Sequence, residues 1–150
     1  MGRFTTGVTV VTTRNPKGGN IGVTVNSFAS VSLDPPLVLF CLDKAALSFE
    51  AFGSAGQFAV NFLCAEQHAL SVRFSTTTAD KWEGVAYDIW PTDLPVLRDC
   101  LVNLGCHKEA VHEGGDHVII VGRVDALRLD GEKRPLVYYQ SGYREIGASL

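Results

Sequence analysis

The sequence predicts a mainly β protein, an antiparallel barrel that carries a few short helices. Runs of β-branched and aromatic residues recur along the 150 residues, and clusters of Gly, Pro, Asn and Asp separate most of them. Strands dominate and short turns join consecutive ones, which favours an antiparallel barrel. A chain of this length can bury a core of its own, so we expect residues 1–150 to form a single domain.

Seven strands are expected from segments of strand-forming composition bounded by turn residues. They cover residues 7–13, 21–27, 37–42, 57–64, 96–111, 117–129 and 136–139. The clearest hairpin joins the two longest strands through residues 113–116 (EGGD), and Asp130-Gly131 marks the next turn. From Gly142 onward the sequence predicts a tail.

Two short helices are predicted between the strands. They cover residues 49–52 and 65–74. Ser48 is the candidate N-cap of the first, which is expected to end at Gly53. Leu70 and Phe74 lie four residues apart on one face of the second. Residues 75–95 show no clean period and contain both Trp residues, so they are expected to form a long, ordered loop with a functional role.

Composition narrows the range of partners. The net charge is −3 and no Lys/Arg cluster is present, which argues against nucleic-acid binding and against an anionic membrane surface. No segment resembles a membrane span or a signal peptide, so a cytoplasmic protein is expected. Only 19% of the residues are charged and 46% are apolar, so part of the surface is expected to be covered, most simply by a second copy of the chain.

Several catalytic motifs are absent. The sequence has no GxSxG, HExxH, GxxxxGK[ST] or strand-linked GxGxxG, which removes acyl transfer, zinc hydrolysis and P-loop chemistry. No pair of carboxylates stands at a defined helical spacing, so glycosidase chemistry has no support. The four cysteines lack CxxC spacing and are predicted to be small buried hydrophobes.

Residues 22–42 (GVTVNSFASVSLDPPLVLFCL) form the strongest candidate for a ligand surface. They are almost uncharged and yet rich in hydroxyl and amide side chains. A solvent-facing strand edge normally carries Lys, Glu or Arg, so a row of small neutral donors suggests a surface for a polar, anionic or aromatic ligand. A Ser/Thr-rich loop on a β-domain is the alternative.

Six segments, taken in order, resemble the flavin reductase-like family over nearly the whole chain. They are GVTVVTT, GVTVNSFASVSLDPPLVLFCLDKAALSFEAF, FAVNFL, DKWEG, GGDHVIIVGRV and PLVYYQSGYR. The resemblance implies an FMN-binding split barrel of antiparallel Greek-key type, a homodimer, and hydride transfer from NADH or NADPH to FMN or FAD. Reduced flavin would pass to a partner flavin-dependent monooxygenase. Such a reaction needs no protein acid or base, since the cofactors carry the chemistry and the protein orients them.

The resemblance implies a first set of flavin-binding residues. Asn26 and Ser27 would meet the isoalloxazine edge, Ser30 and Ser32 would suit phosphate or ribityl oxygens, and Ser48 would donate to phosphate. The full set is Thr24, Val25, Asn26, Ser27, Ser30, Ser32, Phe40, Cys41, Leu42 and Ser48. For the polar residues the alternative is turn capping or an ordinary loop position. For the apolar strand residues it is core packing, and for Ser48 it is helix capping.

The resemblance also implies a phosphate side and a nicotinamide side. Lys81 in DKW matches a basic residue near the flavin phosphate, and a solvated surface lysine is its alternative. His117 in GGDH matches a histidine that contacts the nicotinamide nucleotide, with a structural strand-end role as its alternative. In the C-terminal segment Tyr138 borders the nucleotide, Tyr143 would stack on it and Arg144 would pair with a nucleotide phosphate.

Two departures from the family and two other functions stay open. The family commonly has a basic residue where Gln140 stands, and relatives usually carry a helix before GRFTTGVTVV, so the start is trimmed or lacks that helix. A non-catalytic flavin carrier or sensor could use the same barrel, and so could a pyridoxamine-phosphate-oxidase-like enzyme. The residues do not distinguish FMN from FAD, or NADH from NADPH.

Overall fold

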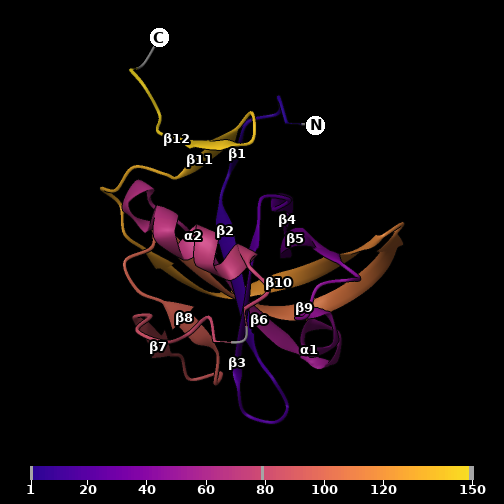
Figure 1. Ribbon diagram of the computed structural model, residues 1–150. Coiled ribbons are helices and arrows are strands. Elements are labelled where there is room, and N and C mark those ends of the chain that lie inside the picture. Colours follow the sequence, from indigo (N-terminus) through magenta and orange to yellow (C-terminus); the bar gives the residue numbers. More distant parts are fainter. Residues whose placement is uncertain (1, 79, 149–150) are drawn as a thin grey trace.

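The computed structural model describes residues 2–78 and 80–148, and β-strands dominate it (Figure 1). The elements are β1 (Thr6–Gly7), β2 (Thr9–Arg14), β3 (Asn20–Val25), β4 (Ala29–Leu33), β5 (Pro36–Asp43), α1 (Phe49–Ser54), β6 (Gln57–Phe62), η1 (Ala65–Gln67), α2 (His68–Ser75), β7 (Tyr87–Ile89), β8 (Pro95–Leu97), β9 (Val102–Gly114), β10 (His117–Leu129), β11 (Val137–Tyr139) and β12 (Gly142–Arg144). None of the helices in these ranges is long and apolar enough to cross a membrane.

A seven-stranded antiparallel sheet forms the barrel, in the order β3-β2-β6-β9-β10-β5-β4. The two ends of this order, β3 and β4, are edges that pair with no further strand among the described residues. Beyond the end of β3 the Ser27 hydroxyl accepts a hydrogen bond from the Cys41 backbone N–H at 2.9 Å and donates to the Cys41 carbonyl at 3.2 Å. This side chain therefore bridges the first edge to β5, and the predicted antiparallel barrel is confirmed.

The barrel interior is filled by alternate residues of its strands. Phe40 of β5 and Phe58 of β6 are fully buried there, as is Phe52 contributed by α1, and the ring of Phe40 meets the rings of Phe52 and Phe58 edge to face at 5.7 and 5.2 Å. A Cβ on Gly122 of β10 would lie 2.4 Å from the Phe58 ring, so glycine is needed for the ring to pack against that strand. Burial of these aromatic rings supplies much of the free energy that holds the sheet closed.

A second apolar cluster lies between α2 and the first strands. Phe74 of α2 is fully buried in it, together with Leu63, Leu97 and Leu136. A Cβ on Gly22 of β3 would lie 2.6 Å from the Phe74 ring, so only glycine lets the helix approach this strand so closely. The predicted contact face of this helix is confirmed, because Leu70 packs against the same cluster.

The remaining strands form two small sheets. β1, β11 and β12 pair in the order β1-β11-β12 beside the two chain ends, at the top of Figure 1, and β7 pairs with β8 below α2. β9 and β10 each have 13 residues and extend beyond the barrel as a long hairpin.

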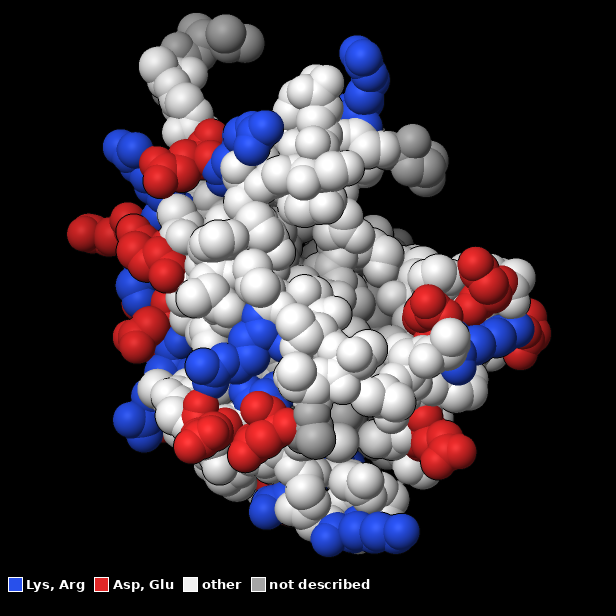
Figure 2. Space-filling model, in the orientation of Figure 1, with Lys and Arg blue, Asp and Glu red and all other residues white. Residues whose placement is uncertain are grey.

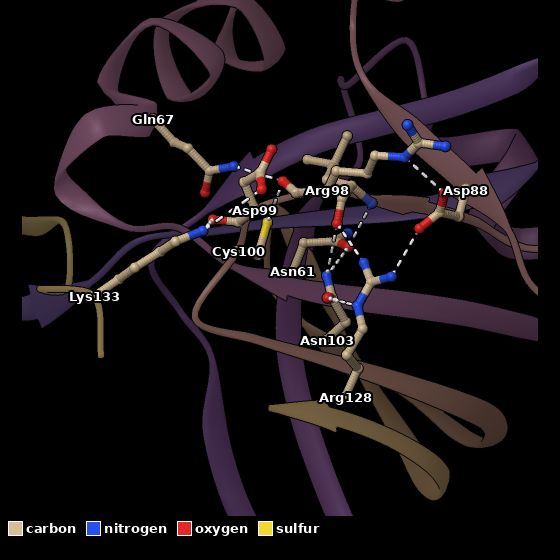
Figure 3. A network of polar contacts seen from close by, with 10 residues as sticks. Asn61, Gln67, Asp88, Arg98, Asp99, Cys100, Asn103, Arg128 and Lys133 are labelled. Atoms are coloured by element: carbon tan, nitrogen blue, oxygen red, sulfur yellow. Dashed lines mark hydrogen bonds and ion pairs between the residues drawn. The ribbon is translucent and has the colours of Figure 1, made fainter. Parts of the chain in front are cut away.

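A network of buried amides and ion pairs holds the β7–β8 sheet against the barrel (Figure 3). Asn61 of β6 accepts hydrogen bonds from the Leu97 backbone N–H at 3.0 Å and from the Asn103 amide at 2.8 Å. Arg128 donates to the Asn103 side chain and to the Asp88 carboxylate, both at 2.8 Å. Every polar side chain named here has a partner inside the protein, which is what burial of polar groups requires.

The structure corrects several predicted boundaries. The prediction of one continuous strand over residues 96–111 is wrong, because β8 ends at Leu97 and a turn with Asp99 at φ 60° precedes β9. Asp tolerates this left-handed conformation, and two apolar strands around one such residue look like a single run. The prediction that residues 75–95 form one ordered loop is also wrong in part, since β7 lies within this range.

The prediction of a tail from Gly142 onward is wrong as well, because Gly142–Arg144 forms β12. Gln140 and Ser141 have φ 47° and 58°, the left-handed pair that a two-residue hairpin turn requires, and neither residue is typical of that turn. β4 was not predicted, and α1 continues through Gly53 to Ser54. The prediction of four buried strand cysteines is only partly confirmed, because Cys64 and Cys100 are buried but lie outside the strands, and Cys41 on β5 is only half buried.

Candidate functional site

The free edge strand β3 is surrounded by three adjoining cavities. The strand-end cavity, of about 210 Å³, is lined by Val23, Thr24, Val25, Asn26, Ser27, Cys41, Leu42, Asp43, Ala46 and His117. The lysine cavity, of about 130 Å³, is lined by Asn20, Ile21, Gly22, Leu47, Ser48, Thr78, Lys81 and Trp82. The tyrosine cavity, of about 250 Å³, is lined by Val8, Thr24, Asn26, Ser71, Ser75, Tyr138 and Tyr143. Every residue from 20 to 27 therefore lines one of them.

Most hydroxyl groups at the strand-end cavity are already used by the protein. Thr24 donates to the Ser71 carbonyl at 2.7 Å, and the Ser27 hydroxyl forms the bridge to Cys41. Asn26 is exposed, and it lines both this cavity and the tyrosine cavity. The side chain best placed to meet a ligand here is thus the Asn26 amide, with the backbone around it.

His117 lies at the start of β10, opposite Asp43 of β5, at the rim of the strand-end cavity. Its Nδ1 lies 2.8 Å from the Asp116 carboxylate. The hydrogen bond from His117 holds the pKa of Asp116 below its ordinary value. Because Asp116 engages Nδ1, the other ring nitrogen is the one available to a ligand.

The lysine cavity holds a partly desolvated cation. Lys81 donates to the Phe74 carbonyl at 3.0 Å, and burial lowers the pKa of its ammonium group. Ser48 is buried beside it, at the N-terminal end of α1, and its side chain forms no capping hydrogen bond. Ser48 does occupy the predicted N-cap position, where its backbone carbonyl accepts a hydrogen bond from the Phe52 N–H at 3.1 Å, so its hydroxyl is not used by the helix. The buried oxygen Oδ1 of Asn20 also has no hydrogen-bond partner within residues 2–78 and 80–148.

An aromatic stack positions Lys81. The indole of its neighbour Trp82 meets Phe74 and Tyr87 edge to face, with both ring centroids at 5.1 Å. Gly22 provides the space for Phe74, and its own Cβ would lie 3.4 Å from Trp82. Burial of these rings against β3 thus fixes a loop residue next to the edge strand.

The tyrosine cavity joins α2 to the small C-terminal sheet. The Tyr143 hydroxyl lies 2.8 Å from the Ser71 hydroxyl, and its ring meets Tyr138 at 5.4 Å and His68 at 4.5 Å. Ser71 and Ser75 are four residues apart, so both face the cavity from one side of the helix.

The structure brings most of the predicted site residues together, but not all. Those that line the three cavities are Thr24, Val25, Asn26, Ser27, Cys41, Leu42, Ser48, Lys81, His117, Tyr138 and Tyr143. Phe40 is fully buried in the barrel core. Ser30 and Ser32 lie on β4, and Arg144 donates to the Tyr143 carbonyl from an exposed position on β12. None of these four residues lines a cavity described above, and a ligand role for them stays a prediction.

Several cavity residues escaped prediction from the sequence, among them Asn20, Ser71, Ser75 and Trp82. The serines carried a usable signal, because polar residues four apart share one face of a helix. Asn20 lies at the end of a run of turn formers, and its composition alone does not separate a turn residue from the first residue of an edge strand.

Figure 2 shows that Lys, Arg, Asp and Glu side chains gather toward the periphery of one face, around an uncharged and hollowed middle. A barrel with an unpaired edge strand, a half-buried lysine, a histidine nitrogen open to a ligand and aromatic walls defines a class of proteins that bind flat, anionic ligands. The chain belongs to the flavin reductase-like family, since the family model "Flavin reductase like domain" matches residues 1–147. The predicted family is thereby confirmed.

Named relatives support this assignment. The chain is 41% identical over 146 residues to the "Flavin-dependent monooxygenase, reductase subunit HsaB" of Rhodococcus jostii (strain RHA1), which covers 97% of this chain and 74% of the relative. It is 47% identical over 133 residues to "FMN reductase (NADH) SmoA" of Agrobacterium fabrum, covering 88% of this chain and 75% of that protein. The solved structure of the Streptomyces globisporus NADH:FAD oxidoreductase SgcE6 with NAD and FAD fragments superposes with a TM-score of 0.92 at 32% identity, over 97% of this chain and 88% of that one. The predicted split-barrel class is confirmed by such structures.

Proposed function

We propose that this chain uses NADH or NADPH to reduce FMN or FAD and that a partner monooxygenase consumes the reduced flavin. The predicted class, an NAD(P)H-dependent flavin reductase, is confirmed by relatives named as an FMN reductase (NADH) and an NADH-dependent flavin reductase. Relatives named as reductase subunits of monooxygenases support the partner. The observation that carries the proposal is the row of three cavities along β3. The strand-end cavity suits the flavin ring, the lysine cavity suits its ribityl phosphate, and the tyrosine cavity suits the nicotinamide nucleotide.

The residues that line the cavities suit one orientation of the bound flavin. The ring fits between Asn26 and the Cys41–Leu42 segment, and the phosphate fits beside Lys81 and Ser48. When bound, the flavin supplies the N5 atom that accepts hydride from the nicotinamide. The protein orients the two reactants and excludes water, so it needs no acid or base of its own.

The nicotinamide nucleotide is placed by the groups on the open side of the ring. His117 contributes its free ring nitrogen, and Tyr143 and Tyr138 contribute aromatic walls. Arg144, on the exposed edge of the C-terminal sheet, reaches a nucleotide phosphate in this arrangement.

Steady-state turnover tests the function directly. The purified chain is mixed with FMN or FAD and with NADH or NADPH, and loss of nicotinamide absorbance is followed. We expect oxidation only when flavin is present. Flavin binding without turnover for any of the four combinations would instead identify a carrier or sensor.

The same proposal includes a homodimer. On the outer face of β5 and β10 the apolar residues Leu39, Cys41, Ile119 and Val121 face away from the barrel core and are only half buried. Ile119 is paired with Cys41, which lines the strand-end cavity, so a second copy seated on this face would border the flavin. A cytoplasmic location is supported by four free cysteines, as thiols persist in reducing compartments.

Sedimentation velocity distinguishes this face from others. Val121→Arg places a charge in the apolar face and is expected to give monomers with reduced flavin affinity. Leu127→Arg, on the exposed far part of the same strand, is the matched control and keeps the dimer. A dimer that persists in the Val121 variant places the interface elsewhere.

A further inference from the structure

Only two buried side-chain polar atoms in the described ranges lack a hydrogen-bond partner, Oγ1 of Thr6 and Oδ1 of Asn20. Each lines a cavity: Thr6 lies on a mainly apolar cavity of about 310 Å³, and Asn20 lies on the lysine cavity. A buried polar atom without a hydrogen-bond partner destabilises the fold, so its presence is explained best by a partner from outside the protein, and for the amide oxygen of Asn20 that partner must be a donor.

The surroundings of Asn20 show what kind of donor is missing. It is the first residue of β3, and pairing with Arg14 on β2 holds its backbone in place. The other polar walls of the cavity come from Lys81, Ser48 and Thr78, which can all donate hydrogen bonds to an anion. The Asn20 carbonyl oxygen only accepts hydrogen bonds, and an ionised phosphate has none to donate. Its hydrogen bond must therefore come from a hydroxyl or amine elsewhere on the same ligand.

Apolar groups close the rest of this cavity. Ile21, Leu47 and Trp82 line it together with the polar residues. A ligand segment with carbon-bound hydroxyls next to an anionic end satisfies both kinds of wall. The ribityl phosphate of a flavin has this chemistry, which FMN and FAD share.

We propose that Asn20 is a further flavin-binding residue, which accepts a hydrogen bond from a ribityl hydroxyl next to the phosphate held by Lys81 and Ser48. This inference rests on the proposed flavin reductase function. It adds a polar contact at the start of β3, outside the segment that resembles the family motif from Gly22 onward.

The test exploits the opposite effects of a binding contact on affinity and on stability. Asn20→Leu removes the unpaired acceptor, so the flavin-free protein is expected to melt roughly 2–4 °C higher. The same variant is expected to bind FMN, FAD and riboflavin roughly tenfold more weakly in fluorescence titrations, since all three flavins carry the ribityl chain.

A second variant separates the hydroxyl from the phosphate. Asn20→Asp retains an acceptor but adds a negative charge, so riboflavin affinity is expected to change little while FMN and FAD affinities fall roughly tenfold. Asn15→Asp, in the turn before β3, adds the same charge outside the cavity. It is the matched control and keeps the affinity of the unaltered protein.

The outcomes distinguish this inference from the proposed function. Unaltered protein that binds none of the three flavins would overturn both. If the unaltered protein binds flavin and Asn20→Leu binds it equally well, only the role of Asn20 fails. A lower melting temperature in Asn20→Leu, with the affinity reduced to the same extent for every ligand in both variants, would mean that Asn20 supports the fold.

Discussion

The amide network around Asn61 and the lysine cavity around Lys81 both contain buried polar atoms. They differ in whether the protein itself provides the hydrogen-bond partners of these atoms. In the network, Asn61 and Asn103 are fully buried and hydrogen-bonded to neighbouring chain segments (Figure 3). In the cavity, Lys81 has one protein partner and the Asn20 oxygen has none. Buried polar groups with complete hydrogen bonding serve the fold, and those left incomplete indicate a ligand.

This difference separates two kinds of experimental effect. Changes in the network should lower the free energy of unfolding and leave flavin affinity per folded molecule unaltered. Changes in the cavities should lower flavin affinity and leave the free energy of unfolding nearly unaltered, because the protein gains little stability from groups whose partners it does not contain.

The largest effect is expected for Asn61→Leu. The substitution removes the hydrogen bonds that Asn61 makes with the Val10 carbonyl, the Leu97 N–H and the Asn103 amide, of which the last keeps only its bond to the Leu97 carbonyl. We expect the free energy of unfolding to fall by about 3–5 kcal/mol, measured by urea denaturation. A loss below about 1 kcal/mol would mean that water replaces the missing amide.

Lys81→Ala is expected to weaken FMN binding roughly tenfold to thirtyfold at low salt, with a smaller difference at high salt. Riboflavin, which has no phosphate, should bind nearly as before. Burial already lowers the pKa of Lys81 from 10.5, so its ammonium loses the proton at a lower pH than an exposed lysine does. As the pH is raised, the FMN affinity of the unaltered protein should therefore begin to fall before pH 10.5 is reached. Lys17→Ala, in the exposed turn before β3, is the control that should leave titrations unchanged.

His117→Ala is expected to raise the Michaelis constant for the nicotinamide nucleotide roughly tenfold and that for flavin much less. His112→Ala, on the exposed facing strand of the same hairpin, tests for a general effect on the hairpin. An equal rise of both constants in the His117 variant would place this residue in the fold and not at the nucleotide.

The smallest effect is expected for Asp88→Asn, at the exposed end of the network. The hydrogen bond from Arg128, and then that from Arg98, lowers the pKa of Asp88 below 3.8. A depressed carboxyl pKa stabilises the folded state above pH 3.8, and this contribution is lost as the pH falls through the lower folded-state value. Since a third of the side chain is exposed, the loss at neutral pH should be about 1 kcal/mol or less, and the two proteins should converge in stability below pH 3.8.

Local sequence patterns predicted most elements and missed those that depend on single backbone conformations. The β10 strand was predicted with its observed bounds because a long β-branched run is bounded by turn residues on both sides. The break at Asp99 and the Gln140-Ser141 turn were missed because non-glycine residues adopt φ values there that composition does not signal. Strand β4 follows from pairing with β5, which is a long-range contact.

The candidate site divides in the same way. Its most informative stretch, 22–27, was identified from an uncharged run of hydroxyl and amide residues, and it does line the cavities. Which of those hydroxyls remain free was not predictable, because Thr24 and Ser27 bond to Ser71 and Cys41 far along the chain.

By itself the sequence determined the β class, the family, and which residue types were available to bind a flavin, because strand periodicity and motif order are local properties of the chain. Only the tertiary structure decided that Lys81, Ser48 and Asn20 share one cavity, and that Asn61 and Asn103 serve the core. Whether a polar side chain is satisfied depends on neighbours that folding brings from distant positions, so a binding group and a structural one look alike until the chain has folded.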